Sequence, residues 1–152
     1  MFNKIFPQTI DNTLNGRWLG FWLLIPVLLF KIMIAIGSIL VPAAANSTDG
    51  IDMSTYPAAA LQEALVATSL LGLLHLAIGL MCVLAMIRYR AMIPLIYVWL
   101  LLEFAGRRVL LNIYAIERSG DASTAVIMNS VLLALMLVGF IFSVTPRKQK
   151  IA

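Results

Sequence analysis

The chain has 152 residues, of which 62% are hydrophobic and only 12% are charged, and its mean hydropathy is +0.98. Soluble globular domains average about 45–50% apolar and about 25% charged residues. This composition therefore excludes a soluble domain, and its hydrophobicity also excludes an intrinsically disordered chain. A single cysteine excludes a disulfide-stapled secreted scaffold. The remaining class is an integral membrane protein.

Four long apolar stretches predict four transmembrane helices, at residues 18–41, 61–87, 91–116 and 125–144. A helix needs about 20 residues to cross the hydrocarbon core of a bilayer. The ten-residue alternating strands of a membrane barrel are absent. We therefore expect an all-α fold, a four-transmembrane-helix bundle in which residues 1–152 form a single membrane domain. The longest connection, residues 42–60, is expected to be a loop with turn residues followed by a helix start.

The first apolar stretch has one alternative interpretation, a cleaved signal peptide. Lys4 and Arg17 precede it, and the alanines at 43–45 imitate a signal-peptidase site. The apolar run is about 23 residues long, however, against about 7–15 for the core of a signal peptide. It also contains Lys31. We therefore expect an uncleaved first span.

The distribution of Lys and Arg predicts how the chain is threaded. The N-terminal segment, the turn between the second and third stretches and the C-terminal tail carry seven basic residues and one acid, a net charge of +6. The other two connections and the start of the second stretch carry one basic residue and five acids, a net charge of −4. The positive-inside rule then places both termini in the cytoplasm, in a multi-pass protein of the inner (cytoplasmic) membrane. Because orientation accounts for the basic charge, we expect no nucleic-acid partner.

Five ionisable side chains within or near the apolar stretches are the candidate ligand-binding residues: Lys31, His75, Glu103, Arg107 and Arg108. At about 1.5 Å per residue, the first three lie near the midplane and the arginines lie one turn further out. A lone central charge costs about 2.5–3.5 kcal/mol on an insertion scale. These side chains should therefore face the bundle interior, pair with each other or line water. We expect Glu103 to pair either with Arg107, four residues along the same helix, or with Lys31.

Small residues support inward-facing positions for two of the five. Lys31 shares a helix face with Ala35 and Ser38, and His75 shares one with Gly72, Gly79 and Cys82. Transmembrane helices approach most closely along such stripes of small residues. The alternative for His75 is a buried structural histidine, and for the whole set a charge cluster that only fixes helix register.

The arginines allow two interpretations. Gly106 could end the third helix as a C-cap, in which case Arg107 and Arg108 would mark an interface and reach the lipid headgroups. Residues 109–116 are still mostly apolar, so we expect the longer helix. Arg108 then shares a face with Phe104 and is available to a lipid phosphate.

The sequence excludes several chemistries. One histidine and one cysteine exclude a bis-histidine haem, a disulfide relay and a closed Cys/His metal site within one chain. No Walker A loop, dinucleotide-binding glycine pattern or GxSxG elbow is present. We therefore expect no metal, no cofactor and no catalytic residue.

We favour a binding or transport module, because Lys31, Arg107 and Arg108 outnumber Glu103 and would suit an anionic lipid or amphiphile. One alternative is an accessory or assembly subunit that contacts a second copy or another membrane protein. The other is a lipid- or quinone-directed enzyme with His75 or Glu103 as acid or base.

Overall fold

The structure is a computed structural model that describes residues 5–7, 9–14, 16–114 and 122–145. Within these ranges the chain is helical and contains no strand. The elements, in chain order, are α2 (Trp18–Leu40), the short α3 (Pro42–Thr48), α4 (Ala58–Arg88), the 3-10 turn η1 (Arg90–Met92), α5 (Ile93–Ile113) and α6 (Ser123–Val144). The all-α class is therefore confirmed.

Three of these helices, α2, α4 and α6, are long and apolar enough to cross a membrane. Each of the four predicted stretches contains a helix with slightly different ends; α4 begins at Ala58, for example, and α5 begins only after the 3-10 turn. The helix α5 runs through Gly106 to Ile113, so the longer of the two interpretations is confirmed. It contains Glu103, Arg107 and Arg108 within six residues and is not among the three helices that are long and apolar enough to cross a membrane. The end of the third predicted stretch, residues 115 and 116, lies outside the described residues.

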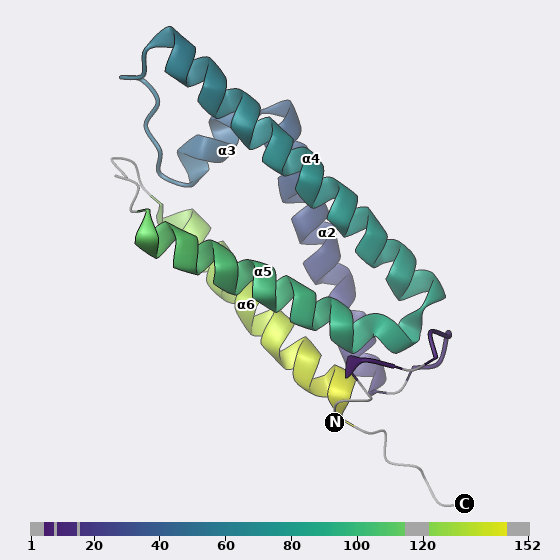
Figure 1. Cartoon of the computed structure of the whole chain (residues 1–152). Helices are drawn as coiled ribbons and strands as arrows, with labels where there is room; N and C mark the ends of the chain where they lie inside the picture. Colours follow the sequence, from purple (N-terminus) through teal and green to yellow (C-terminus); the bar gives the residue numbers. More distant parts are fainter. Residues whose placement is uncertain (1–4, 8, 15, 115–121, 146–152) are drawn as a thin grey trace, which may run out of the picture.

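The helices form two arms that meet at one end of the molecule (Figure 1). One arm contains α2, α3 and α4, and the other contains α5 and α6. The arms meet around the tight turn between α4 and α5 and separate toward α3. The basic residues Arg17, Arg88 and Arg90 lie at the closed end, where the Arg17 backbone N–H donates to the carbonyl of Phe142 on α6 (3.1 Å).

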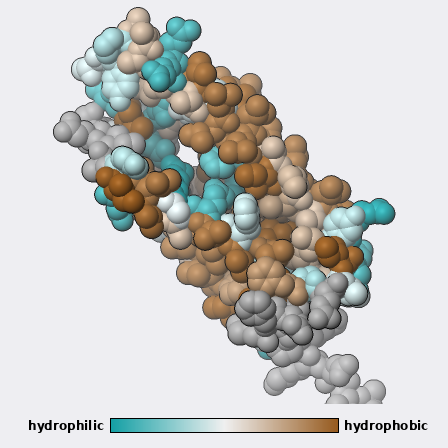
Figure 2. Space-filling model, in the orientation of Figure 1, coloured by the Kyte–Doolittle hydropathy of each residue, from teal (hydrophilic) through white to brown (hydrophobic). Residues whose placement is uncertain are grey.

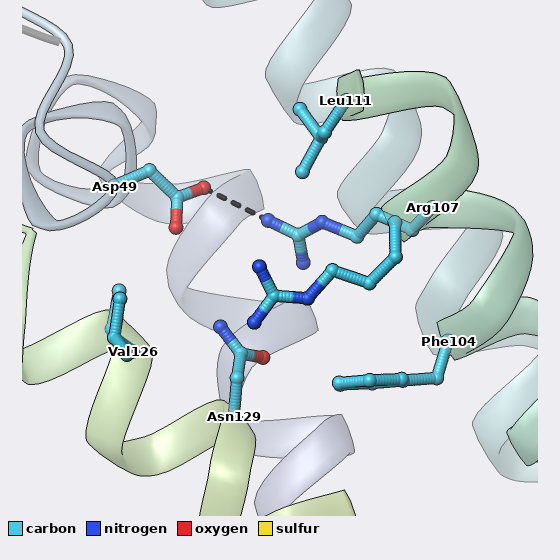
Figure 3. A pocket seen from close by; sticks show the side chains of 8 residues that line it. Asp49, Phe104, Arg107, Leu111, Val126 and Asn129 are labelled. Atoms are coloured by element: carbon cyan, nitrogen blue, oxygen red, sulfur yellow. Dashed lines mark hydrogen bonds and ion pairs between the residues drawn. The ribbon is translucent and has the colours of Figure 1, made fainter. Parts of the chain in front are cut away.

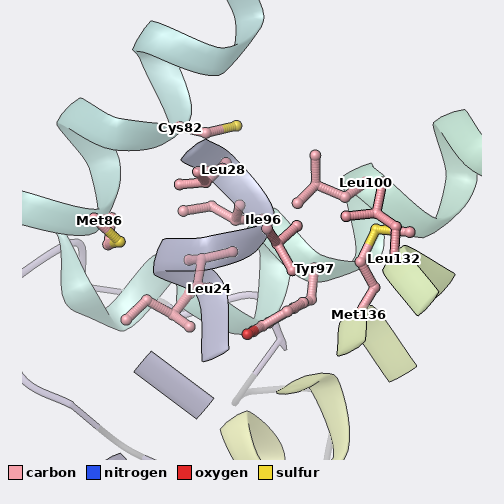
Figure 4. Close-up of a cluster of buried hydrophobic side chains, with 11 residues drawn as sticks. Leu24, Leu28, Cys82, Met86, Ile96, Tyr97, Leu100, Leu132 and Met136 are labelled. Carbon is pink, nitrogen blue, oxygen red and sulfur yellow. The ribbon is translucent and has the colours of Figure 1, made fainter. Parts of the chain in front are cut away.

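Apolar packing explains why the arms meet at that end. The buried cluster draws on the first half of α2, the last third of α4, the first half of α5 and the middle of α6 (Figure 4). Its members are Leu24, Val27, Leu28, Cys82, Met86, Ile93, Ile96, Tyr97, Leu100, Leu132 and Met136. All of these positions belong to the basic half of the molecule. The other half of each helix has no comparable apolar contact across the arms among the described residues.

Two glycines allow the close approach of helices at the closed end. A Cβ on Gly20 would lie 2.8 Å from the backbone nitrogen of Ser143, and one on Gly139 would lie 2.2 Å from the hydroxyl oxygen of Tyr97. Tyr97 is fully buried, and its hydroxyl donates to the carbonyl of Gly20 (2.8 Å). One tyrosine thus ties α5 to α2 across the face of α6.

The predicted stripe of small residues lies at the α2–α4 contact. A Cβ on Gly72 would lie 2.9 Å from the carbonyl oxygen of Ala35, and one on Gly79 would lie 3.0 Å from the side chain of Ile32. The inward orientation expected for this face of α4 is therefore confirmed.

The helix α3 was not predicted. Pro42 occupies its first position, where the missing N–H costs nothing. Asn46 is buried, and its side-chain amide donates to the hydroxyl of Thr68 on α4 (3.0 Å). This contact holds α3 against α4, and the chain leaves the helix through Gly50 at a φ of 80°, a value that favours glycine. As a result Asp49, at the C-cap of α3, points toward the other arm.

The open end of the molecule is acidic. Asp49, Asp52 and Glu63 all lie there, and the backbone N–H of Ser54 donates to the Asp52 carboxylate (2.9 Å). That hydrogen bond lowers the pKa of Asp52 below its ordinary value, so this carboxylate is ionised at neutral pH. Among the described residues other than the five candidates, the basic side chains therefore lie at one end of the long helices and, apart from Asp11, the acidic side chains lie at the other, as the charge count predicts.

Candidate polar site between the arms

Three of the five candidate residues meet between the arms. Lys31 of α2 donates from Nζ to Oε2 of Glu103 on α5. The other carboxylate oxygen, Oε1, lies 3.4 Å from Nε2 of His75 on α4. These three side chains, one from each of three helices, are called the ion cluster below. The choice left open for Glu103 is thereby resolved in favour of Lys31.

The ion cluster is not sealed from solvent. The exposed fractions of its side chains are 19% for Lys31, 26% for Glu103 and 38% for His75. Each residue lies near the middle of its helix, just beyond the apolar cluster where the arms begin to separate. The two charges compensate each other, so with a neutral imidazole the cluster has no net charge.

Arg107 does not pair with Glu103. One guanidinium nitrogen lies 3.0 Å from Oδ2 of Asp49, so the ion pair joins α5 to the end of α3 (Figure 3). The i,i+4 pair on α5 was therefore the wrong alternative, because α3 folds back and presents a carboxylate to the arginine. Both side chains of the Asp49–Arg107 pair remain substantially exposed.

Arg108 lies beside this pair with a different set of contacts. Its guanidinium carbon is 5.7 Å from the ring centroid of Phe104, the neighbour predicted for it, in a cation–π geometry. Among the described residues no carboxylate forms an ion pair with Arg108. It is therefore the surplus cation of the site.

A small cavity separates the two arginines from α6. It is lined by Asp49, Phe104, Arg107, Arg108, Leu111, Ala125, Val126 and Asn129, which are called the arginine pocket below. Its volume of about 20 Å³ is enough for one water molecule. In Figure 3, Asn129 and Val126 project from α6 toward the guanidinium groups, and Asp49 and Leu111 lie at the opposite side.

The space-filling surface is hollowed between the arms. Figure 2 shows an opening there, with hydrophilic residues gathered around it and hydrophobic residues over the outer surfaces of both arms. Polar groups therefore line the inside of the separation. Large apolar side chains such as Leu70, Leu74 and Leu102 are exposed.

The structure thus divides the five predicted residues into two neighbouring groups. Lys31, His75 and Glu103 form the ion cluster, whereas Arg107 and Arg108 belong to the arginine pocket about one helical turn away. Neither Lys31 nor His75 lines that pocket.

The charge balance also differs from the prediction. Three cations were expected against one acid, but α3 adds Asp49, so the surplus is one positive charge instead of two. Asp49 could not be predicted as a residue of the site, because its position depends on α3. Asn129 could not be predicted either, because a single amide in an apolar helix forms no recognisable sequence pattern.

Comparison of the chain with known protein families, with curated proteins and with solved structures gives no match. In the described part of the chain, no three His, Cys, Asp or Glu side chains are grouped so that they could hold a metal ion. The inference about function therefore depends on the ion cluster and the arginine pocket.

Proposed function

We propose that this protein is a four-span membrane protein that binds the anionic end of a lipid or small amphiphile between its two arms. The observation that carries the proposal is Arg108, a cation at membrane depth without a carboxylate partner among the described residues, in a pocket that also contains Arg107 and Asn129. Ionisable groups inside membrane spans usually belong to ligand-binding sites or to pathways for ions and substrates, because burying a charge in the bilayer is costly.

The fourth span in this proposal is α5. Its 21 residues extend about 32 Å at about 1.5 Å per residue, enough for a hydrocarbon core of about 30 Å. Its apolar residues Ile93, Ile96 and Leu100 are buried against the other helices. Its charged side chains find Lys31 and Asp49 on the opposite arm, which lowers the cost of their depth.

The two ends of the molecule support a threading with both termini inside. The basic end contains Arg17, Arg88 and Arg90, and the acidic end contains α3 and Asp52. By the positive-inside rule the basic end faces the cytoplasm. The arginine pocket then lies in the outer half of the bilayer.

The chemistry of the pocket suits a phosphate or carboxylate. A guanidinium group can donate two parallel hydrogen bonds to either anion, and the side-chain amide of Asn129 supplies further donors. The cavity itself has room for one water molecule only. The anionic group of the ligand would therefore lie at its mouth, against the exposed guanidinium groups of Arg107 and Arg108, and its apolar part would lie in the open separation or the surrounding lipid.

The test is the thermal stability of the purified protein in a neutral detergent with added phosphatidylglycerol or phosphatidylcholine. We expect a larger rise in Tm with the anionic lipid, because its phosphate has no ammonium group of its own that competes with Arg108. Arg108→Gln should remove the difference between the lipids. Arg88→Gln, which changes an exposed arginine at the basic end, should preserve it.

A second variant tests the charge balance. Asp49→Asn releases Arg107 from its ion pair and raises the surplus from one positive charge to two, so the difference between the lipids should increase. Equal stabilisation by both lipids in the unmodified protein would contradict the proposal. So would loss of the difference in Arg88→Gln alone, and either result would favour an accessory subunit.

A further inference from the structure

We propose that His75 is an exchangeable proton-binding site coupled to the arginine pocket, so that the protein takes up a proton when it binds its anion. The coupling rests on the proposed function, whereas the proton site itself rests only on the ion cluster. The observation is the juxtaposition of a part-exposed imidazole with a carboxylate that is shared with a lysine in the separation between the arms.

The contact with Glu103 orients the imidazole. Nε2 of His75 lies 3.4 Å from Oε1 of Glu103, so the neutral ring carries its hydrogen on Nε2, because two lone pairs would otherwise face each other. The second nitrogen, Nδ1, is the free base in this tautomer. No hydrogen bond joins Nδ1 to a described residue, and the side chain is 38% exposed, so water in the hollow can reach it.

Protonation at Nδ1 is chemically simple. The Nδ1 lone pair accepts a proton from water-borne hydronium, no covalent bond in the protein breaks, and the charge of the ion cluster changes from zero to +1. An imidazole ordinarily exchanges its proton between about pH 5 and pH 8. The Glu103 carboxylate, which lies 3.4 Å from the ring and is shared with Lys31, stabilises the added charge.

The charged groups on the elements packed against α4 lie at different distances from His75. The helix α2 supplies Lys31, α5 supplies Glu103, and η1 supplies Arg90 at the far, basic end. The acid of α3, Asp49, is already paired with Arg107. On α4 itself, Cys82 is the titratable group two turns beyond His75. Glu103 is therefore the carboxylate that faces the imidazole.

The ion cluster is close enough to influence the arginine pocket. Glu103 and Arg107 are four residues apart on α5, and side chains at this spacing are neighbours on a helix. A positive charge added to the ion cluster attracts an anion in the pocket about one helical turn away. By reciprocity an anion in the pocket favours the protonated imidazole by the same factor.

The chain contains one histidine, which makes the proton site directly observable. Protein labelled with ¹⁵N-histidine in detergent micelles gives imidazole signals from His75 alone. We expect these signals to change from the neutral to the cationic form between pH 8 and pH 5.5. Cys82→Ser, which removes the neighbouring titratable thiol, should leave this change intact. A His75 that keeps one protonation state across the range would overturn the proton site.

The coupling is measured by adding short-chain phosphatidylglycerol to the same sample. We expect the protonated fraction of His75 at pH 7 to rise, and phosphatidylglycerol affinity to increase at least about fivefold from pH 8 to pH 6. His75→Gln should remove this pH dependence. Binding without any effect on the His75 signals would overturn the coupling and leave the proposed function standing. Absence of binding at every pH would contradict the proposed function, and the coupling with it, while the titration without lipid still decides the proton site.

Discussion

At the scale of single residues, the contact between Lys31 and Glu103 joins the two arms. Breaking one side of a buried ion pair can cost about 3–5 kcal/mol, since the remaining charge loses its partner, whereas removing both charges can be nearly neutral. Partial exposure of both side chains places this pair at or below the lower end of that range. Glu103→Gln should therefore lower the Tm in detergent, and adding Lys31→Met should restore part of the loss.

The control for this double variant replaces Arg107, the other partner that the sequence predicts for Glu103. Because Arg107 contacts Asp49 instead, adding Arg107→Met to Glu103→Gln should restore less of the lost stability than adding Lys31→Met. Recovery in that double variant, with none in the Lys31 double variant, would reverse the assignment of partners.

The residues of the ion cluster could be predicted from the sequence. Their separation from Arg107 and Arg108, which belong to the arginine pocket, could not. Depth along a helix follows from residue counting, so the ionisable side chains could be placed in one layer of the membrane. The choice between Lys31 and Arg107 could not be made, because both partners suit Glu103 in charge and reach. The Asp49–Arg107 pair could not be predicted, since it depends on how seven residues of α3 fold back on α4.

At the scale of helices, Gly20 allows α2 and α6 to approach closely at the closed end. A Cβ at Gly20 would lie 2.8 Å from the backbone nitrogen and 2.9 Å from the Cα of Ser143, and backbone cannot move aside as a side chain can. Gly20→Ala should therefore destabilise the protein by about 1–3 kcal/mol, the usual range for overpacking. The measurement is the Tm in detergent.

The same helix provides the control. A Cβ at Gly37 would meet no atom within 4 Å. Gly37→Ala should be neutral or slightly stabilising, because alanine favours a helix over glycine by about 1 kcal/mol in water. Equal losses for the two substitutions would mean that the closed end does not depend on the α2–α6 contact.

The positions of the long helices could be predicted from the sequence, but the angles at which they pack could not. A helix in a bilayer satisfies its backbone hydrogen bonds within itself, so an apolar run of sufficient length identifies it from local sequence. The angle between the arms depends instead on an apolar cluster built from four separate helices, including the buried Tyr97. No periodicity in a single helix encodes that arrangement, and α3 is too short to show one.

At the scale of the whole molecule, the proposed threading requires the basic and acidic ends to lie on opposite sides of the membrane. A background without Cys82 permits single cysteines to be introduced in α3, at Ser47, and in the α4–η1 turn, at Tyr89. An impermeant thiol reagent added to intact cells should label the Ser47→Cys variant and not the Tyr89→Cys variant. Labelling of the Tyr89→Cys variant alone would indicate the opposite orientation in the membrane. Labelling of both variants would place the two positions on the same side.

Native mass spectrometry from a mild detergent tests directly whether the separation between the arms holds an anionic amphiphile on Arg108. The protein should retain one anionic lipid, the Arg108→Gln variant should release it, and the Arg88→Gln variant should keep it. Equal retention by the unmodified protein and by Arg108→Gln would contradict the proposed function. Release of a partner protein with no bound lipid would contradict it as well, and would identify an accessory subunit instead.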